Sequence, residues 1–338
     1  MPRVAFLGLG AIGTPMARHL ARPEFDLAVW NRTGPKAEAM ARELGVRHAR
    51  TPADAARDCD IVITCLPVSR YVEALLDGPD GLLVTMQSGA VLVDCTSGDG
   101  ATSRRMAARL AERGIGFLDA PVSGGQAGAE NGVLTVMCGG DPEDYAKAEP
   151  LIAHFSRMRK LLGPAGSGQL AKMVNQICIA GIVQGLAEGL HFARANGLSE
   201  AKVIEAISAG AAQSWQMQNR WKTMVDGKFD FGFAVDWMRK DLRIALDAAR
   251  TSGASLPITS LVDQFYADVQ AEGLRLDAAA CLAKGAIVDM GLRRTRCLAA
   301  IALAAEQVGV AQATFDRTLA YTLVREQFGR SIAQFQAI

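Results

Sequence analysis

Short apolar runs alternate with alanine-rich helical stretches over the first part of the chain, from residue 3 to about residue 160. Runs of this length between turn residues are typical of buried strands. Strands that alternate with helices along a chain form a parallel sheet covered by those helices. The pattern therefore predicts an α/β domain with a doubly wound, Rossmann-type sheet. The predicted strands are Val4–Leu7, Leu27–Trp30, Ile61–Ile63, Val91–Val93 and Phe117–Leu118.

The pattern changes at the glycine-rich segment 163–168, after which strand-like runs disappear and helix-forming residues dominate. We predict a long helix from about Gly168 to Ala195, ended by Asn196-Gly197. A helical hairpin region follows, to about residue 272. The second part of the chain is therefore expected to be all helical.

The length of the chain, 338 residues, exceeds the usual size of a single hydrophobic core. We expect a doubly wound Rossmann-type domain, an all-helical domain and a helical tail, with the bounds 1–163, 164–290 and 291–338.

Composition narrows the classes of function. The 36 Lys and Arg nearly cancel the 35 Asp and Glu, so the formal net charge is +1, and electrostatic binding of nucleic acid is not expected. The seven cysteines are scattered without a C-x-x-C pair, and the four histidines do not cluster with them. We therefore expect reduced thiols, a cytoplasmic location and no metal site.

Neither a signal peptide nor a membrane span is expected. The N-terminus runs directly into the strand-like stretch from Arg3 to Gly8. The longest apolar stretch, Ile177–Leu190, is interrupted by Gln184 and Glu188 and is shorter than the roughly 20 residues that a span needs. It is interpreted as a buried helix.

A glycine-rich loop follows the first predicted strand. Gly8, Gly10 and Gly13 form G-x-G-x-x-G between that strand and a helix. The first glycine allows a tight turn, the second lets the backbone approach a pyrophosphate, and the third permits close helix packing. An ordinary glycine-rich turn is the alternative. The place at the head of a β-α-β unit favours a dinucleotide site, which includes Leu9 and Ile12.

The end of the second predicted strand indicates which dinucleotide is bound. NAD enzymes usually carry an acidic residue here to bind the ribose hydroxyls, but this chain has Asn31. Arg32 offers a planar cation suited to a 2′-phosphate, and Thr33 and Lys36 add a hydroxyl and a second charge. NADP is favoured and NAD stays possible. The alternative is that Arg32 and Lys36 are solvated surface charges.

A second loop has the composition of an anion site. Ser123, Gly124 and Gly125 follow a predicted strand end, where doubly wound sheets place ligands. They offer a hydroxyl and unobstructed backbone N–H groups to a carboxylate. A plain turn is an equally good interpretation of these residues taken alone.

Lys172 and Asn175 lie three positions apart in the predicted long helix, on one face among apolar neighbours. A lysine in an apolar run must be desolvated or open into a cleft. Desolvation lowers a lysine pKa towards the range in which it exchanges protons at neutral pH. Lys172 is therefore the leading candidate for a general acid/base.

At these motifs, and at Lys240-Asp241-Leu242, the chain resembles the 3-hydroxyisobutyrate dehydrogenase-like β-hydroxyacid dehydrogenases over residues 1 to about 272. These enzymes are related to 6-phosphogluconate dehydrogenase. The resemblance implies a homo-oligomeric two-domain enzyme that transfers hydride between NAD(P) and a small β-hydroxyacid or its semialdehyde. In that reaction Lys172 would be the general acid/base.

The resemblance also implies roles for other residues. Ser123 and Gly124 would hold the substrate carboxylate, and Asn175 would hydrogen-bond the substrate beside Lys172. The residues that would line the cofactor are Leu66, Pro67, Thr96 and Lys240. Gln176 departs from the family pattern, in which a second Asn often follows Asn175.

Two other functions compete with the dehydrogenase. Imine reductases use the same scaffold but commonly replace the lysine, and non-catalytic members of such scaffolds lose it. Lys172 argues against both, although an unusual tail keeps the second alternative open.

The tail from about Arg296 onward is similar to an internal helical segment of acyl-CoA dehydrogenases, in which the arginine matching Arg325 helps bind flavin. The rest of that fold is missing, so we interpret the tail as a fused fragment and not as a flavoprotein. An amphipathic helix is expected from Cys297 to about Gln327, and its apolar face is expected to pack on the helical domain or on a partner.

Overall fold

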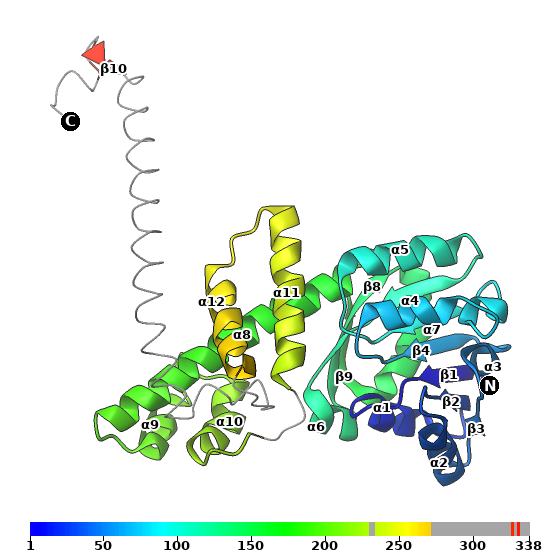
Figure 1. The fold of residues 1–338 in the computed structure, drawn as a ribbon, viewed down its shortest axis with the longest axis horizontal. Coiled ribbons are helices and arrows are strands. Elements are labelled where there is room, and N and C mark those ends of the chain that lie inside the picture. The colour runs from blue at the N-terminus through cyan, green and yellow to red at the C-terminus, as the bar shows by residue number, and fades with distance from the viewer. Residues whose placement is uncertain (230–233, 272–325, 328–329, 332–338) are drawn as a thin grey trace. The chain divides into compact units, whose positions relative to one another are not determined.

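A computed structural model describes residues 1–229, 234–271, 326–327 and 330–331 of the chain, which runs from blue to red in Figure 1. The chain divides into two compact units, Met1–Leu282 and Ala283–Ile338. Within the second unit the description covers only the antiparallel strands β10 (Glu326–Gln327) and β11 (Arg330–Ser331). The predicted tail helix otherwise lies outside the described residues.

The first unit contains a nine-stranded sheet whose order is β3-β2-β1-β4-β5-β6-β8-β7, with β9 paired to β8. Strands β1 to β6 are all parallel, and the order runs outward from β1 in both directions. This confirms the predicted doubly wound sheet. The strands are β1 (Arg3–Leu7), β2 (Asp26–Trp30), β3 (Arg47–His48), β4 (Ile61–Thr64), β5 (Val91–Asp94), β6 (Gly116–Asp119), β7 (Val122–Ser123), β8 (Leu134–Gly140) and β9 (Ser156–Leu161).

The sequence pattern predicted a sheet that is parallel throughout. In the structure, however, β8 runs antiparallel to β6 and β7. Only a short segment joins β6 to β8, and it holds β7 and the six-residue helix α6 (Gly125–Glu130). A segment without a full crossover helix returns the chain in the opposite direction. Strand β9, with the sequence SRMRKL, was missed because its polar residues hide the strand pattern.

Helices cover both faces of the sheet, as expected for strands buried on two sides. Val4 and Phe6 belong to one hydrophobic cluster, and Ala5 and Leu7 belong to another. Because successive strand residues point to opposite faces, the clusters lie on opposite sides of the sheet. The helices of this part are α1 (Gly13–Leu20), α2 (Gly34–Leu44), α3 (Pro52–Ala56), α4 (Ser69–Leu76), α5 (Gly100–Ala111) and α7 (Pro142–Ile152), with 3-10 turns at Leu82–Val84 and Ala153–Phe155.

The predicted long helix is α8 (Ser167–Ala195), and Asn196 caps its end before Gly197, which has a φ of 72°. Helices α9 (Glu200–Ile207), α10 (Trp215–Val225), α11 (Val235–Ser252) and α12 (Pro257–Ala271) follow. Helix α8 packs against α10, α11, α12 and β8. The described residues from 167 to 271 confirm the all-helical prediction.

Helix α8 is longer than the apolar stretch Ile177–Leu190 suggested. By length and composition alone its 29 residues could cross a membrane, a test that core helices of soluble proteins also pass. The whole helix thus passes this test, although its apolar stretch Ile177–Leu190 is shorter than a span. Gln169, Lys172 and Gln176 are nevertheless buried on this helix, and each of these polar side chains requires a protein environment.

Candidate active site

The glycine loop has the shape of a phosphate cradle. Gly8 adopts a φ of 105°, and a Cβ on it would lie 2.3 Å from the Cys65 carbonyl oxygen. A Cβ on Gly13 would lie 2.0 Å from the Gly8 carbonyl oxygen, so both positions require glycine. Nothing lies within 4 Å of the Cβ position at Gly10, which leaves the backbone open to a ligand. Protein atoms thus occupy the space beside Gly8 and Gly13, whereas the space beside Gly10, which a pyrophosphate approaches, is open.

Asn31 holds this loop in place from the end of β2. Its side-chain oxygen accepts a hydrogen bond from the Leu9 backbone N–H at 3.0 Å, and its side-chain nitrogen donates to the Thr33 carbonyl at 3.3 Å. Ile12 lies at the start of α1, where unpaired backbone N–H groups favour an anion. Asn31 therefore stabilises the glycine loop through hydrogen bonds to the protein backbone.

The positive residues after β2 lie at the surface. Arg32 and Lys36 are both exposed, and among the described residues neither lies within 4 Å of a carboxylate. The Arg32 guanidinium carbon lies 5.9 Å from the centre of the Tyr71 ring. The end of β2 thus carries the neutral Asn31 where NAD enzymes usually carry an acid, followed by the exposed Arg32, which forms no ion pair with the described residues.

The loops after β4 and β5 are joined by a buried carboxylate. Asp94 accepts hydrogen bonds from the Thr64 hydroxyl at 2.9 Å and from the Thr96 backbone N–H at 3.0 Å. The Thr96 hydroxyl in turn accepts from the Leu66 backbone N–H at 3.0 Å. Burial raises the pKa of Asp94 to about 6, although these hydrogen bonds oppose the rise. Thr96 is buried, so its hydroxyl positions Leu66 and the exposed Pro67 that follows.

A second buried carboxylate joins the sheet to α8. Asp119, at the end of β6, accepts hydrogen bonds from the backbone N–H groups of Gly166 at 2.7 Å and Gln169 at 2.8 Å. Burial raises the pKa of Asp119 to about 7. The Gln169 side chain donates to the Thr96 carbonyl at 2.7 Å and accepts from the Gly98 N–H at 2.8 Å. The start of α8 is therefore positioned against the loops that follow β5 and β6.

Lys172 lies one turn beyond this junction, with only 6% of its surface exposed. The pKa of Lys172 is lowered from 10.5 to about 8, mainly by burial; Asp241 opposes this shift and Lys240 adds to it. A lysine with this pKa exchanges protons readily near neutral pH. The predicted desolvation of Lys172 is thus seen in the structure.

Asn175 and Ser123 meet beside this lysine. The Ser123 hydroxyl, on β7, lies 3.5 Å from the Asn175 side-chain oxygen. The Asn175 side-chain nitrogen donates to the Gln176 side-chain oxygen at 2.8 Å, and Gln176 donates to Asp241 at 2.7 Å. Gln176 therefore occupies the position that departs from the family pattern and connects Asn175 to a carboxylate on α11.

Lys240 reaches from α11 to the sheet. Its ammonium nitrogen donates to the Ser97 carbonyl oxygen at 2.5 Å and lies 2.9 Å from Asp241. Lys240 and Ser97 line a pocket of about 380 Å³ together with residues at the starts of α4 and α5. This hydrogen bond connects the helical part to the loop after β5.

The loop after Ser123 takes conformations that favour glycine. Gly124 has a φ of 132° and Gly125 a φ of 63°, and a Cβ on Gly124 would lie 3.1 Å from the Leu134 side chain. These residues therefore form a tight turn directly beside Ser123. The two glycines therefore add no side chain of their own next to Ser123.

The structure thus brings the predicted residues together in two groups. One consists of the glycine loop, Asn31, Arg32 and Thr33, and the other surrounds Lys172. Sequence reasoning gave no role to the buried residues that hold these groups, which are Asp94, Asp119, Gln169 and Asp241. Their signal was present, because each is polar within or beside an apolar run.

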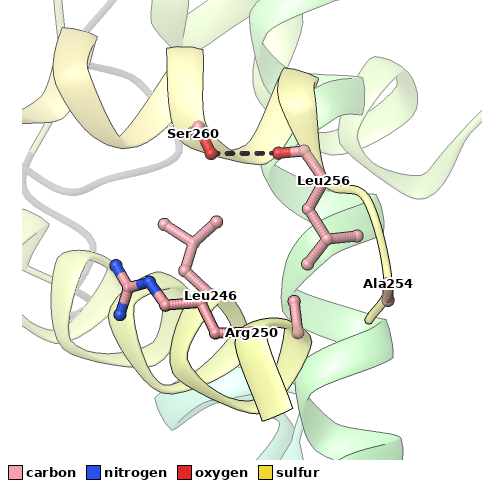
Figure 2. Close-up of a pocket in the computed structure, with 6 residues that line it drawn as sticks. Leu246, Arg250, Ala254, Leu256 and Ser260 are labelled. Carbon is pink, nitrogen blue, oxygen red and sulfur yellow. Dashed lines mark hydrogen bonds between the residues drawn. The ribbon is translucent and has the colours of Figure 1, made fainter. Parts of the chain in front are cut away.

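A further pocket, of about 220 Å³, lies at the turn between α11 and α12 (Figure 2). Leu246, Arg250 and Leu256 line it, and the Ser260 hydroxyl donates to the Leu256 carbonyl at 3.1 Å. It contains none of the predicted site residues and does not belong to the candidate active site.

Comparison with known families agrees with this arrangement. Residues 3–164 match the family model of the NAD binding domain of 6-phosphogluconate dehydrogenase. Residues 166–284 match the model described as NAD-binding of NADP-dependent 3-hydroxyisobutyrate dehydrogenase. The chain belongs to the 3-hydroxyisobutyrate dehydrogenase family. As a member of this family, it is an NAD(P)-dependent oxidoreductase that acts on the hydroxyl group of hydroxy acids.

The matches with individual relatives extend over nearly the whole length of those relatives. An uncharacterized oxidoreductase of Shewanella frigidimarina is 56% identical over 84% of this chain and 98% of its own. The NAD-dependent L-serine dehydrogenase of Pseudomonas aeruginosa is 37% identical over 79% of this chain and 91% of its own. The structure of Mycobacterium tuberculosis 3-hydroxyisobutyrate dehydrogenase with L-serine has a TM-score of 0.76 at 29% identity, covering 83% of this chain and 98% of that one.

The tail has a separate relationship. Residues 294–338 match the family model of the acyl-CoA dehydrogenase C-terminal domain, which confirms the predicted resemblance. The predicted family, fold class, enzyme class and NAD(P) cofactor are likewise confirmed.

Proposed function

We propose that this 3-hydroxyisobutyrate dehydrogenase family member transfers hydride between NADP(H) and a small β-hydroxyacid similar to 3-hydroxyisobutyrate, or its semialdehyde. Lys172 acts as the general acid/base. The observation that carries the proposal is a buried lysine with a pKa of about 8 beside Ser123 and Asn175. In this proposal residues 1–163 bind the cofactor, residues 164–290 complete the substrate site, and 291–338 form an added tail.

The cofactor, when bound, supplies the hydride acceptor or donor. Its pyrophosphate fits the open backbone at Gly10, and its 2′-phosphate fits the unpaired Arg32, with Thr33 close by. Leu66 and Pro67 line the cofactor site, and the Thr96 hydroxyl fixes the backbone of Leu66 by accepting a hydrogen bond from its N–H group. Lys240 holds the loop after β5 through its hydrogen bond to the Ser97 carbonyl oxygen.

The protein residues position and deprotonate the substrate. Ser123 and the turn at Gly124 and Gly125 receive the carboxylate, and Asn175 hydrogen-bonds the hydroxyl beside Lys172. During oxidation the hydroxyl proton moves to the neutral Lys172 amine while the carbon-bound hydrogen leaves as hydride. The carbon–oxygen bond becomes a carbonyl, and reduction reverses both transfers. The lowered pKa suits both directions, because a fraction of Lys172 is in each protonation state near pH 8.

The presence of Lys172 also bears on the alternatives. An imine reductase on this scaffold commonly replaces the lysine, and a non-catalytic binding protein has no use for an ammonium group with a high cost of burial. The buried lysine therefore supports the hydroxyacid reaction over both.

We infer that the enzyme is a homo-oligomer. Large apolar side chains are exposed along α8, with Val174 61% and Phe192 67% accessible, and Leu170 and Ile182 continue the same exposed stripe. A second copy of this chain would cover them, and light scattering after size exclusion tests the expectation. The free cysteines of the described residues fit a cytoplasmic enzyme.

A direct assay tests the catalytic proposal. Purified protein is incubated with NADP⁺ or NAD⁺ and a panel of small hydroxy acids that includes 3-hydroxyisobutyrate and L-serine, and formation of reduced nicotinamide is followed by absorbance. Lys172→Met is expected to lower kcat by about 10²- to 10⁴-fold. Lys202→Met, at an exposed lysine of α9, is the matched control and should retain activity. Equal rates for wild type and Lys172→Met with every substrate would refute the proposal.

A further inference from the structure

Two arginines and a tyrosine form a cluster at the carboxyl end of the sheet, and only one of its members, Arg32, has a role in the proposal above. The cluster consists of Arg32, two residues beyond β2, and Arg70 and Tyr71, in the first turn of α4. The two guanidinium carbons lie 5.9 Å and 5.2 Å from the centre of the same Tyr71 ring. We call these three residues the arginine–tyrosine cluster.

The sheet register places the cluster beside the glycine loop. Leu7, the last residue of β1, pairs with Trp30 on β2 and with Thr64 on β4. The chain segments that follow β2 and β4 therefore flank the glycine loop on its two sides. Arg32 comes from one of these segments, and Arg70 from the other.

The charges of the cluster are not balanced by the protein. Among the described residues, no carboxylate lies within 4 Å of the Arg32 or Arg70 guanidinium, although many other arginines of the chain form ion pairs. Both side chains are exposed, and both lower the pKa of the Tyr71 phenol. Two cations that converge on one ring repel each other, and a multivalent anion between them removes that repulsion.

We propose that Arg70 is the second cation of the 2′-phosphate site and that Tyr71 is the platform that orients Arg70 and Arg32 toward it. The 2′-phosphate of NADP carries close to two negative charges and takes hydrogen bonds from more than one guanidinium. NAD has only a hydroxyl at this position and gains nothing from Arg70. Arg70 and Tyr71 are thus specificity-determining residues for the cofactor, an inference that rests on the proposed NADP site at Arg32.

Binding of two adenosine fragments tests the role of Arg70 without any turnover. Adenosine 2′,5′-bisphosphate carries the phosphate in question, whereas ADP lacks it. Isothermal titration of the full chain is expected to show tighter binding of the 2′-phosphorylated fragment. Arg70→Met, which keeps the aliphatic stem, should weaken that fragment about tenfold and leave ADP unchanged. Arg157→Met, at an exposed arginine of β9, is the control and should change neither.

Two further variants separate this inference from the proposed site on which it rests. Arg32→Met should also weaken the 2′-phosphorylated fragment, and the double variant should lose less than the two single losses combined, since both side chains bind one phosphate. Tyr71→Leu removes the platform and should reduce the preference while the fold, followed by circular dichroism, stays intact.

Each contrary result has a distinct meaning. If Arg32→Met removes the preference but Arg70→Met and Tyr71→Leu do not, the inference about the cluster is wrong and the NADP site at Arg32 stands. Equal loss of both fragments in Arg70→Met would also overturn it, because the residue would then lack specificity. If wild type binds both fragments equally, the proposed 2′-phosphate site and the cluster fail together.

Discussion

The burial of Lys172 predicts that the catalytic group destabilises the protein. A methionine in its place has a similar length and no charge to desolvate. Lys172→Met should therefore be more stable than wild type at neutral pH, even though it loses activity. Functional groups held in unfavourable surroundings commonly show this trade-off.

The magnitude follows from the pKa of Lys172, which burial lowers from 10.5 to about 8. The pKa of Lys172 is lower in the folded than in the unfolded protein, so its ammonium form destabilises the folded state. This cost is absent above the unfolded pKa and is fully present once the pH has fallen below the folded pKa. One pKa unit corresponds to about 1.4 kcal/mol. The buried ammonium therefore lowers the free energy of unfolding of wild type by about 3 kcal/mol at pH 7 and by less than about 1 kcal/mol at pH 10. The advantage of the methionine variant should therefore shrink by about 2 to 3 kcal/mol over this range.

Urea unfolding of wild type and Lys172→Met at several pH values between 7 and 10 measures this change. The difference between the two proteins cancels the titration of all other groups. Lys202→Met provides the control, because an exposed lysine should give a difference that does not depend on pH. A constant difference between wild type and Lys172→Met would show that Lys172 has an ordinary pKa, and the argument for its role would lose its physical basis.

Other predictions follow from the same site. The rate of alcohol oxidation should rise and that of carbonyl reduction should fall as the pH passes about 8, because only neutral Lys172 accepts the proton; flat pH profiles would contradict this. Asp241→Asn removes the charge that raises the Lys172 pKa, so the midpoints of both profiles should move to lower pH, and unmoved midpoints would exclude that influence. Wild type should lose stability as the pH rises from 4 through about 7, because burial raises the pKa values of Asp119 and Asp94; chemical denaturation of Asp119→Asn should show a smaller slope than wild type, and an unchanged slope would contradict this. Gly10→Ala should leave the melting temperature unchanged, since its Cβ meets nothing within 4 Å, but should weaken cofactor binding by about tenfold or more in a fluorescence titration; unchanged binding would argue against a pyrophosphate at this loop.

Gln176 shows how a departure from the family pattern is accommodated. Its amide accepts from Asn175 and donates to Asp241, so it transmits the position of α11 to the residue beside Lys172. Asp241 is also the carboxylate that raises the Lys172 pKa. The chain between Gln176 and Asp241 is long, and no local pattern relates the two positions.

Local signals were enough for most of the fold and for the main site residues. Apolar runs predicted the central strands, and the glycine spacing predicted the cradle because tight turns and close approaches admit no side chain. Strand β9 escaped because it carries exposed charges. Strand β8 is apolar, but its antiparallel direction follows from the short connection after β6, which no strand pattern reveals.

The sequence by itself determined the nucleotide-binding fold, the glycine loop, the missing acid after β2 and the presence of a lysine in an apolar helix. These are properties of neighbouring residues, whose spacing and polarity can be read directly. Only the tertiary structure decided that Asp119 and Gln169 position the start of α8, that the charges of Asp241 and Lys240 act on the pKa of Lys172, and that Arg70 joins Arg32 at Tyr71. Electrostatic and hydrogen-bonding partners depend on distance in space, and in this protein they come from strands and helices far apart in the chain.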